Sequence, residues 1–169
     1  MINLTTKEIK GYSNSRIAKS EKNDCFVRAL AAGFEISYDE AHEIAKERFN
    51  RPDKKGTKNH EIISEMKKIQ EEGLVIGDVI AKVKVLKGLD IKNRYKLYGE
   101  LIDRKKTVKS FIKDHPKGNY IVTVSKHAFV VKDGKLIDNV GEEFRPTRKV
   151  DGAYEILLPT DSIQLSLFN

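Results

Sequence analysis

Residues 120–138 read YIVTVSKHAFVVKDGKLID, and this stretch decides the fold class of the chain. Its first five residues are rich in β-branched and aromatic side chains, which favour a strand. Asp133-Gly134, between two apolar runs, is a strong signal of a two-residue hairpin turn. The stretch therefore predicts strands over 120–124, 127–131 and 135–138.

The part of the chain before this stretch reads as helical. Ser37 to Glu40 fits a capping box that opens a helix over 41–49. Thr57 is expected to cap a second helix that runs through Glu71, and Gly73 is expected to end it. An apolar run that starts at Cys25 predicts an earlier helix.

The remaining segments give weaker signals. Thr107 is expected to cap a short helix over 108–114, and a further strand is expected over 154–158. Residues 74–106 are the least regular, although alternation over 79–85 indicates a strand. Helices followed by an antiparallel sheet predict an α+β domain, in which the helices pack on the sheet.

Composition limits the class of protein. Of the 169 residues, 39% are hydrophobic and 34% are charged, which indicates one globular domain and excludes a disordered chain. A single cysteine rules out an internal disulfide framework and fits a reducing compartment. No signal-peptide core and no membrane-spanning run occur, so we expect a cytoplasmic protein with no membrane partner.

The net charge of +7 permits direct binding to nucleic acid, but the lysines are scattered among 25 acidic residues. A solvated lysine-rich surface is the preferred interpretation, and a basic DNA-associated protein is an alternative. Four separated histidines and one cysteine argue against a structural zinc site. We therefore expect no metal and no cofactor.

Cys25 follows the polar pair Asn23-Asp24 and lies in the first turn of the predicted helix. Unpaired N–H groups and the positive end of the helix dipole favour a thiolate there. A thiolate nucleophile needs a base and a group that orients the base. The alternative is that Cys25 is a small buried hydrophobic residue.

His127 and Asp138 can supply that base and that orienting group. Pairing about the Asp133-Gly134 turn brings residue 129 opposite residue 138, with residue 127 nearby. We expect the Asp138 carboxylate to hold the Nδ1 proton of His127, so that Nε2 faces Cys25. Asn139 is a second candidate for the orienting group. The alternative is an ordinary surface histidine and a turn aspartate.

These residues resemble motifs of the papain-like cysteine peptidase superfamily, in its small bacterial and bacteriophage branch. The matching elements are Asn23-Asp24-Cys25, the His127 to Val131 strand, Asp133-Gly134 and Asp138, and the resemblance covers roughly residues 20–140. It implies a papain-like hydrolase domain over residues 1–159, acting on a protein or peptide substrate. By motif match, Cys25 is the nucleophile, His127 the base and Asp138 the orienting group.

The chain departs from that superfamily at one place. Papain-like enzymes usually carry a glutamine several residues before the cysteine, and its side chain helps to bind the oxyanion. Lys19 stands at the equivalent spacing here, which leaves the Cys25 backbone N–H and the Asn23 side chain as candidate donors. Loss of one donor typically costs about 3 kcal/mol of transition-state stabilisation.

Residues 160–169 read as a tail that contains the pentapeptide Gln164-Leu165-Ser166-Leu167-Phe168. This peptide resembles the motif by which bacterial replication and repair proteins bind the β sliding clamp of DNA polymerase III. Leu165, Leu167 and Phe168 would fill an apolar pocket, and Gln164 would supply a directional hydrogen bond. The alternative is a final strand docked on the domain.

Two functions remain open from the sequence. The first is a thiol hydrolase of phage or bacterial origin, in the bacterial host cytoplasm, that docks on the clamp through its tail. The second is an inactive papain-fold binding module that occupies the clamp pocket and interferes with host replication. A cell-wall hydrolase fits the sequence less well than either of these functions, because the sequence shows no export signal.

Overall fold

The computed structural model describes residues 3–5, 9–138 and 146–159, and every structural statement below concerns these residues. The elements follow one another in the order β1 (Asn3–Thr5), α1 (Arg16–Ser20), α2 (Cys25–Phe34), α3 (Tyr38–Arg48), α4 (Asn59–Glu72), β2 (Leu74–Ile76), β3 (Val79–Val85), the 3-10 helix η2 (Gly88–Asp90), β4 (Lys92–Leu97), β5 (Glu100–Lys105), α5 (Val108–Asp114), β6 (Asn119–Val124), β7 (His127–Lys132), β8 (Lys135–Asp138) and β9 (Gly152–Leu157).

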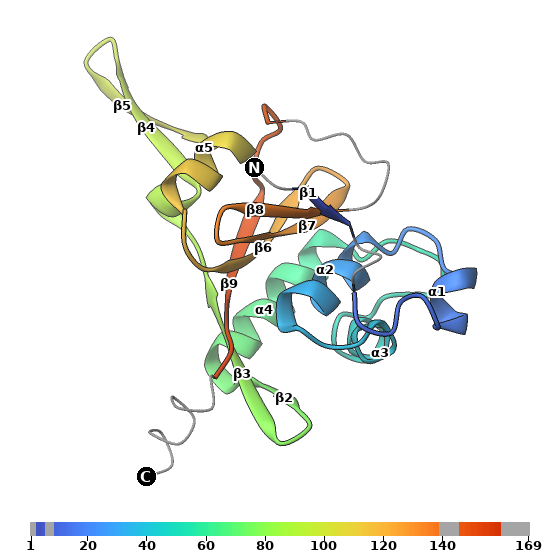
Figure 1. Cartoon of the computed structure of the whole chain (residues 1–169). Coiled ribbons are helices and arrows are strands. Elements are labelled where there is room, and N and C mark those ends of the chain that lie inside the picture. The colour runs from blue at the N-terminus through green and yellow to red at the C-terminus, as the bar shows by residue number, and fades with distance from the viewer. Residues whose placement is uncertain (1–2, 6–8, 139–145, 160–169) are drawn as a thin grey trace.

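Seven strands form the main sheet, in the order β1-β8-β7-β6-β9-β3-β2. All neighbouring strands in it are antiparallel except β1, which pairs in parallel with β8. Helices α2, α3 and α4 lie on one side of the sheet and α5 lies on the other (Figure 1). The expected α+β arrangement is confirmed, whereas the parallel edge strand was not predicted.

The central strands are buried on both faces. Successive side chains of a strand point to opposite faces, so Ile121 and Val130 join the core beneath α2, while Val122 and Val131 join the core beneath α5. This double burial explains why β6 and β7 read as nearly continuous apolar runs rather than as alternating ones.

Helix α2 packs closely against the sheet at Gly33. A Cβ atom on Gly33 would lie 2.9 Å from Cγ1 of the buried Ile121, so a larger residue would force the helix away from β6. The Asn119 side chain of β6 also donates a hydrogen bond to the Gly33 carbonyl, at 2.7 Å. These contacts fix the helix that carries Cys25 at its other end.

Most local signals in the sequence are confirmed. Ser37 and Thr107 cap α3 and α5 by accepting backbone N–H groups from the residue three positions on. The turn residues Asp133 and Gly134 both have left-handed φ, and Lys132 pairs with Lys135 across them. The expected Thr57 cap is wrong: Lys58 precedes α4, and the Thr57 hydroxyl is buried with no partner among the described residues.

The segment 74–106 forms two hairpins. Strand β2 pairs with β3 at the edge of the main sheet, so the predicted strand over 79–85 is confirmed. Strands β4 and β5 form a separate two-stranded sheet that projects away from the body (Figure 1). The predicted tail, residues 160–169, lies outside the described residues, so neither its clamp motif nor the docked-strand alternative is tested.

Candidate functional site

Cys25 is the first residue of α2, and its side chain is half-buried. Asp24 precedes it as the N-cap residue, but the Asp24 side chain makes no capping hydrogen bond. Its carboxylate instead accepts hydrogen bonds from Tyr38 and Arg28, at 2.7 and 3.1 Å. The sulfur therefore lies at a helix N-terminus whose preceding residue is anchored to α3.

The structure brings His127 and Asp138 to this sulfur. His127 directly follows the turn between β6 and β7, and Asp138 ends β8. The His127 Nε2 atom lies 2.7 Å from Asp138 Oδ1, and the ring lines the same cavity as Cys25, close enough for the sulfur to raise its pKa. Residues from the first and last thirds of the chain thus form one Cys-His-Asp group.

The expected roles of the two ring nitrogens are wrong. Nε2 contacts Asp138, which leaves Nδ1 as the nitrogen available to Cys25. The register itself is the expected one: Val130 pairs with Ile137, which places Asp138 opposite residue 129, two positions along β7 from His127. The distal ring nitrogen is the one that reaches a carboxylate displaced along the sheet.

The surroundings of His127 stabilise its protonated form. Burial alone would lower its pKa, but the hydrogen bonds to Asp138 and Cys25 and the negative charge of those partners outweigh burial. Together they raise the pKa of His127 from 6.5 to about 10. This shift favours the imidazolium form of the ring at neutral pH.

We expect a pH dependence of stability from this shift. Folding raises the pKa of His127, so the stabilisation from its charged form is fully present below pH 6.5 and is lost as the pH rises through about 10. Thermal unfolding measured between pH 6 and pH 10.5 should show that loss. An Asp138→Asn variant, which removes the carboxylate charge, should show much less of it, and its ring should titrate at lower pH by NMR. Identical profiles for the two proteins would contradict this account.

Asn23, the candidate second oxyanion donor, lies beside Cys25 with a left-handed φ of 53°. Its side-chain amide donates to the Lys54 carbonyl at 3.3 Å, which engages one of its two N–H groups. Lys19 is exposed in α1 and is not among the described residues that line the cavity at Cys25. Asn139, the second candidate for the orienting group, lies outside the described residues.

A cavity of about 480 Å³ opens at Cys25 and His127. Its walls come from the start of α2, the loop before α4, and the turn between β6 and β7, a composition that sequence reasoning did not predict. The cavity is large enough for several residues of a peptide or for a small acyl group. The lining residues are Asn23, Cys25, Phe26, Gly56, Thr57, Lys58, Asn59, Ile62, Thr123, Val124, Lys126, His127 and Ala128.

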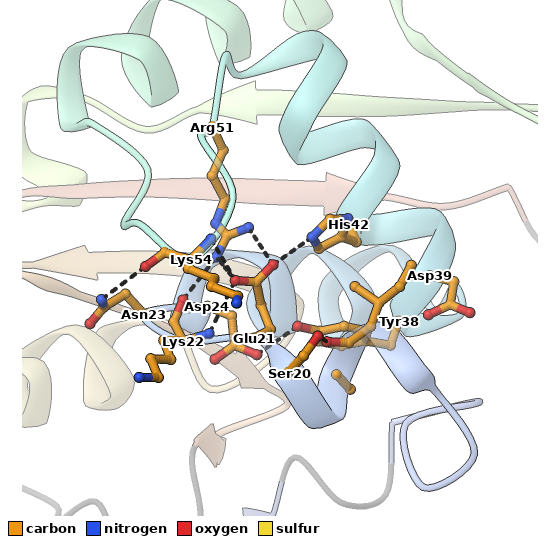
Figure 2. Close-up of polar contacts among 12 residues, drawn as sticks. Ser20, Glu21, Lys22, Asn23, Asp24, Tyr38, Asp39, His42, Arg51 and Lys54 are labelled. Carbon is orange, nitrogen blue, oxygen red and sulfur yellow. Dashed lines mark hydrogen bonds and ion pairs between the residues drawn. The ribbon is translucent and has the colours of Figure 1, made fainter.

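A buried polar cluster holds the segment that precedes Cys25, and Figure 2 shows its side chains converging on Glu21. Glu21 accepts hydrogen bonds from His42 at 2.6 Å, from Arg51 at 3.1 Å, and from the Lys54 backbone at 2.7 Å. Arg51 also donates to the Lys22 carbonyl at 3.0 Å. The loop that forms one wall of the cavity is thereby tied to the residues just before the sulfur.

The charge on Glu21 is well compensated. Burial alone would raise the pKa of Glu21, but hydrogen bonds from Arg51, Lys22 and His42 lower it to about 2. Nothing in the sequence marked this cluster, because its members lie 21 to 33 positions apart and each reads as an ordinary surface charge.

The same cluster contains the described group that best fits a metal ion. Ligand atoms of Glu21, His42 and Asp53 lie within 4.8 Å of one another. However, the Arg51 guanidinium pairs with Glu21, and Arg51 is only 3% exposed. A cation would compete with a buried positive charge for the same carboxylate, so we assign no metal to this group.

Comparisons of the chain with protein-family models, with curated proteins and with solved structures give no match. Among the described helices, none has both the length and the apolar character needed to cross a bilayer.

Proposed function

We propose that this protein is a papain-like thiol hydrolase, a cysteine peptidase or amidohydrolase, that docks on the bacterial β sliding clamp through residues 164–168. The observation that carries the enzymatic part is the contact of His127 with both Cys25 and Asp138 at the mouth of a cavity. The observation that supports the docking part is the pentapeptide in the sequence.

The proposed reaction starts from a Cys25 thiolate beside the His127 imidazolium. The sulfur attacks the carbonyl carbon of an amide, and the carbonyl electrons move onto oxygen. When the C–N bond breaks, His127 gives its proton to the departing amine, and a thioester remains on Cys25. His127, now neutral, takes a proton from water, which attacks the thioester and releases the acid.

Asp138 would orient the ring through this cycle and stabilise its positive charge at the start and end. The oxyanion would accept hydrogen bonds from the Cys25 backbone N–H and from the second N–H of the Asn23 side-chain amide, the one that does not bind Lys54. Because Asn23 is also bound to Lys54, the loop before α4 would help to place this second donor. That arrangement would take the place of the glutamine that is usual in papain-like enzymes.

The second candidate is an inactive papain-fold module that occupies the clamp pocket and interferes with host replication. The observation that favours it is the absence of glutamine before position 70, together with the engagement of the Asn23 amide by Lys54. Both candidates share the clamp-binding tail and differ in the reactivity of Cys25.

A pull-down from bacterial lysate tests the proposal. Wild-type and Cys25→Ala chains would each be compared with versions that lack residues 160–169. We expect the clamp to be recovered with both full-length chains and lost with both shortened ones. We also expect a further protein to accumulate only on Cys25→Ala, which cannot turn its substrate over. Identical partners for wild type and Cys25→Ala would favour the inactive module instead.

A further inference from the structure

The β4–β5 hairpin is an arm whose sequence is not explained by folding. It forms its own two-stranded sheet and projects from the body near α5 (Figure 1). The base of the hairpin contacts the body through Asn93, which donates a hydrogen bond to Ser110, and through the Lys105–Asp151 ion pair. Most of its other side chains are exposed and contribute little to the fold. Their identity therefore points to a contact made outside the domain.

The turn of the arm carries an unusual residue. Tyr98 and Gly99 both have left-handed φ, 50° and 82°, and the Tyr98 side chain is 98% exposed. Glycine or asparagine suits the first of these positions, whereas a bulky side chain is strained there. The chain thus keeps an aromatic ring in water at a conformational cost that no contact within the described residues offsets.

One face of the arm combines an aromatic ring with an arginine. In the β4–β5 register, Tyr95 pairs with Ile102 and Asn93 pairs with Arg104, so these four side chains share a face. Tyr95 is 51% exposed. A groove of about 320 Å³ runs between this face and Lys149 at the base of the arm.

The charges of the arm are strongly unbalanced. Residues 92–105 include five basic side chains and two acidic ones. Arg94 and Lys105 are neutralised by Asp103 and Asp151. Within the described part of the chain, by contrast, Lys96, Arg104 and Lys149, which all line the groove, form no ion pair. The groove therefore offers positive charge to a ligand.

We propose that this face of the β4–β5 arm binds single-stranded nucleic acid. Arg104 and Lys149 would contact phosphates, while Tyr95 in the groove and Tyr98 at the tip would stack on bases. The phosphates of a duplex would also pair with the cations, but its bases are stacked on one another and their faces are not accessible to the tyrosines. An acidic peptide pairs with the cations and gives the rings no comparable partner. This proposal depends neither on the thiol chemistry nor on the tail.

Fluorescence anisotropy with the full chain and a labelled 12-nucleotide oligothymidylate tests the proposal at two salt concentrations. Tyr95→Ala should weaken binding about tenfold, and Tyr98→Ala should weaken it by several-fold, because each removes one stacked base. Arg104→Ala should weaken it by a similar factor and should also reduce the salt dependence. The matched control is Arg16→Ala, which removes one exposed charge from α1 and should change affinity less than twofold.

Three results would overturn the proposal. The first is wild-type affinity in both Tyr95→Ala and Arg104→Ala, with thermal unfolding unchanged. The second is tighter binding of a 12-base-pair duplex than of the single strand, with no effect of Tyr95→Ala. The third is equal binding of poly-glutamate of the same charge with the same dependence on Tyr95, which would assign the arm to an acidic protein partner. Because all these side chains are exposed, we expect the variants to fold.

Discussion

His127→Ala should slow alkylation of Cys25 by iodoacetamide roughly thirtyfold at pH 7. An ordinary cysteine is only a few per cent thiolate at this pH, whereas the proposed mechanism has Cys25 as a thiolate held by the His127 imidazolium. Removing the imidazolium would return the sulfur to the reactivity of a common thiol. Pseudo-first-order labelling, followed by intact mass, measures the rate directly, because the chain has a single cysteine.

The matched control is His60→Ala, which removes a histidine that is largely exposed at the start of α4 and does not line the cavity. Its labelling rate should equal that of the wild type. Asp138→Asn should give an intermediate rate, since it leaves the ring in place but removes its charged partner. If folded wild-type protein labels no faster than the same chain in urea, Cys25 is not activated and the binding-module candidate replaces the hydrolase.

Leu167→Ala combined with Phe168→Ala should weaken binding to the β sliding clamp about a hundredfold or more. Two apolar side chains that fill one pocket are the kind of contact that dominates the affinity of a short peptide, and each truncation typically costs about 2 kcal/mol. Surface plasmon resonance with immobilised clamp and the full chain would measure the loss.

The control for the tail lies within the same peptide. Ser166→Ala should change the affinity by less than about threefold, because the hydroxyl fills no pocket in the proposed mode. Thermal unfolding of all tail variants should match the wild type. Unchanged clamp affinity in the double variant would remove the docking proposal and leave the thiol chemistry untouched.

The parts of the fold that could be predicted carry strong local signals. The Asp133-Gly134 turn set the register of β7 and β8, and that register brought Asp138 near His127 as expected. The Ser37 cap placed the start of α3 in the same way. Turn and cap residues act over three or four positions, so one sequence is enough to identify them.

The β4–β5 arm was missed for a physical reason. Residues 92–97 alternate charged with uncharged side chains, but only Asn93 and Ile102 of the two strands are partly buried and no core face is formed, so the apolar signal that identifies a strand is weak. The Tyr98-Gly99 turn also lacks the asparagine or aspartate that usually marks such a connection. A strand that buries little apolar surface leaves only a weak pattern in the sequence.

The assignment of the histidine nitrogens and the Glu21 cluster could not be predicted either. The first depends on how the His127 ring is turned toward Asp138, which lies opposite a residue two positions along β7, because that orientation decides which ring nitrogen reaches the carboxylate. The second depends on hydrogen bonds to Glu21 from Arg51 and His42, which lie in segments far from Glu21 in the sequence. Contacts that form only in the tertiary structure have no counterpart in local propensity.

The parallel strand β1 gives the start of the chain a part in the chemistry proposed here. Thr5 pairs with Asp138, so β1 covers the outer border of the strand that presents the carboxylate to His127. If the first five residues were trimmed or displaced, β8 would expose unsatisfied peptide groups, and the carboxylate would lose its backbone support. Deleting residues 3–5 should therefore disturb the reactive group, although they lie more than a hundred positions from Asp138 along the chain.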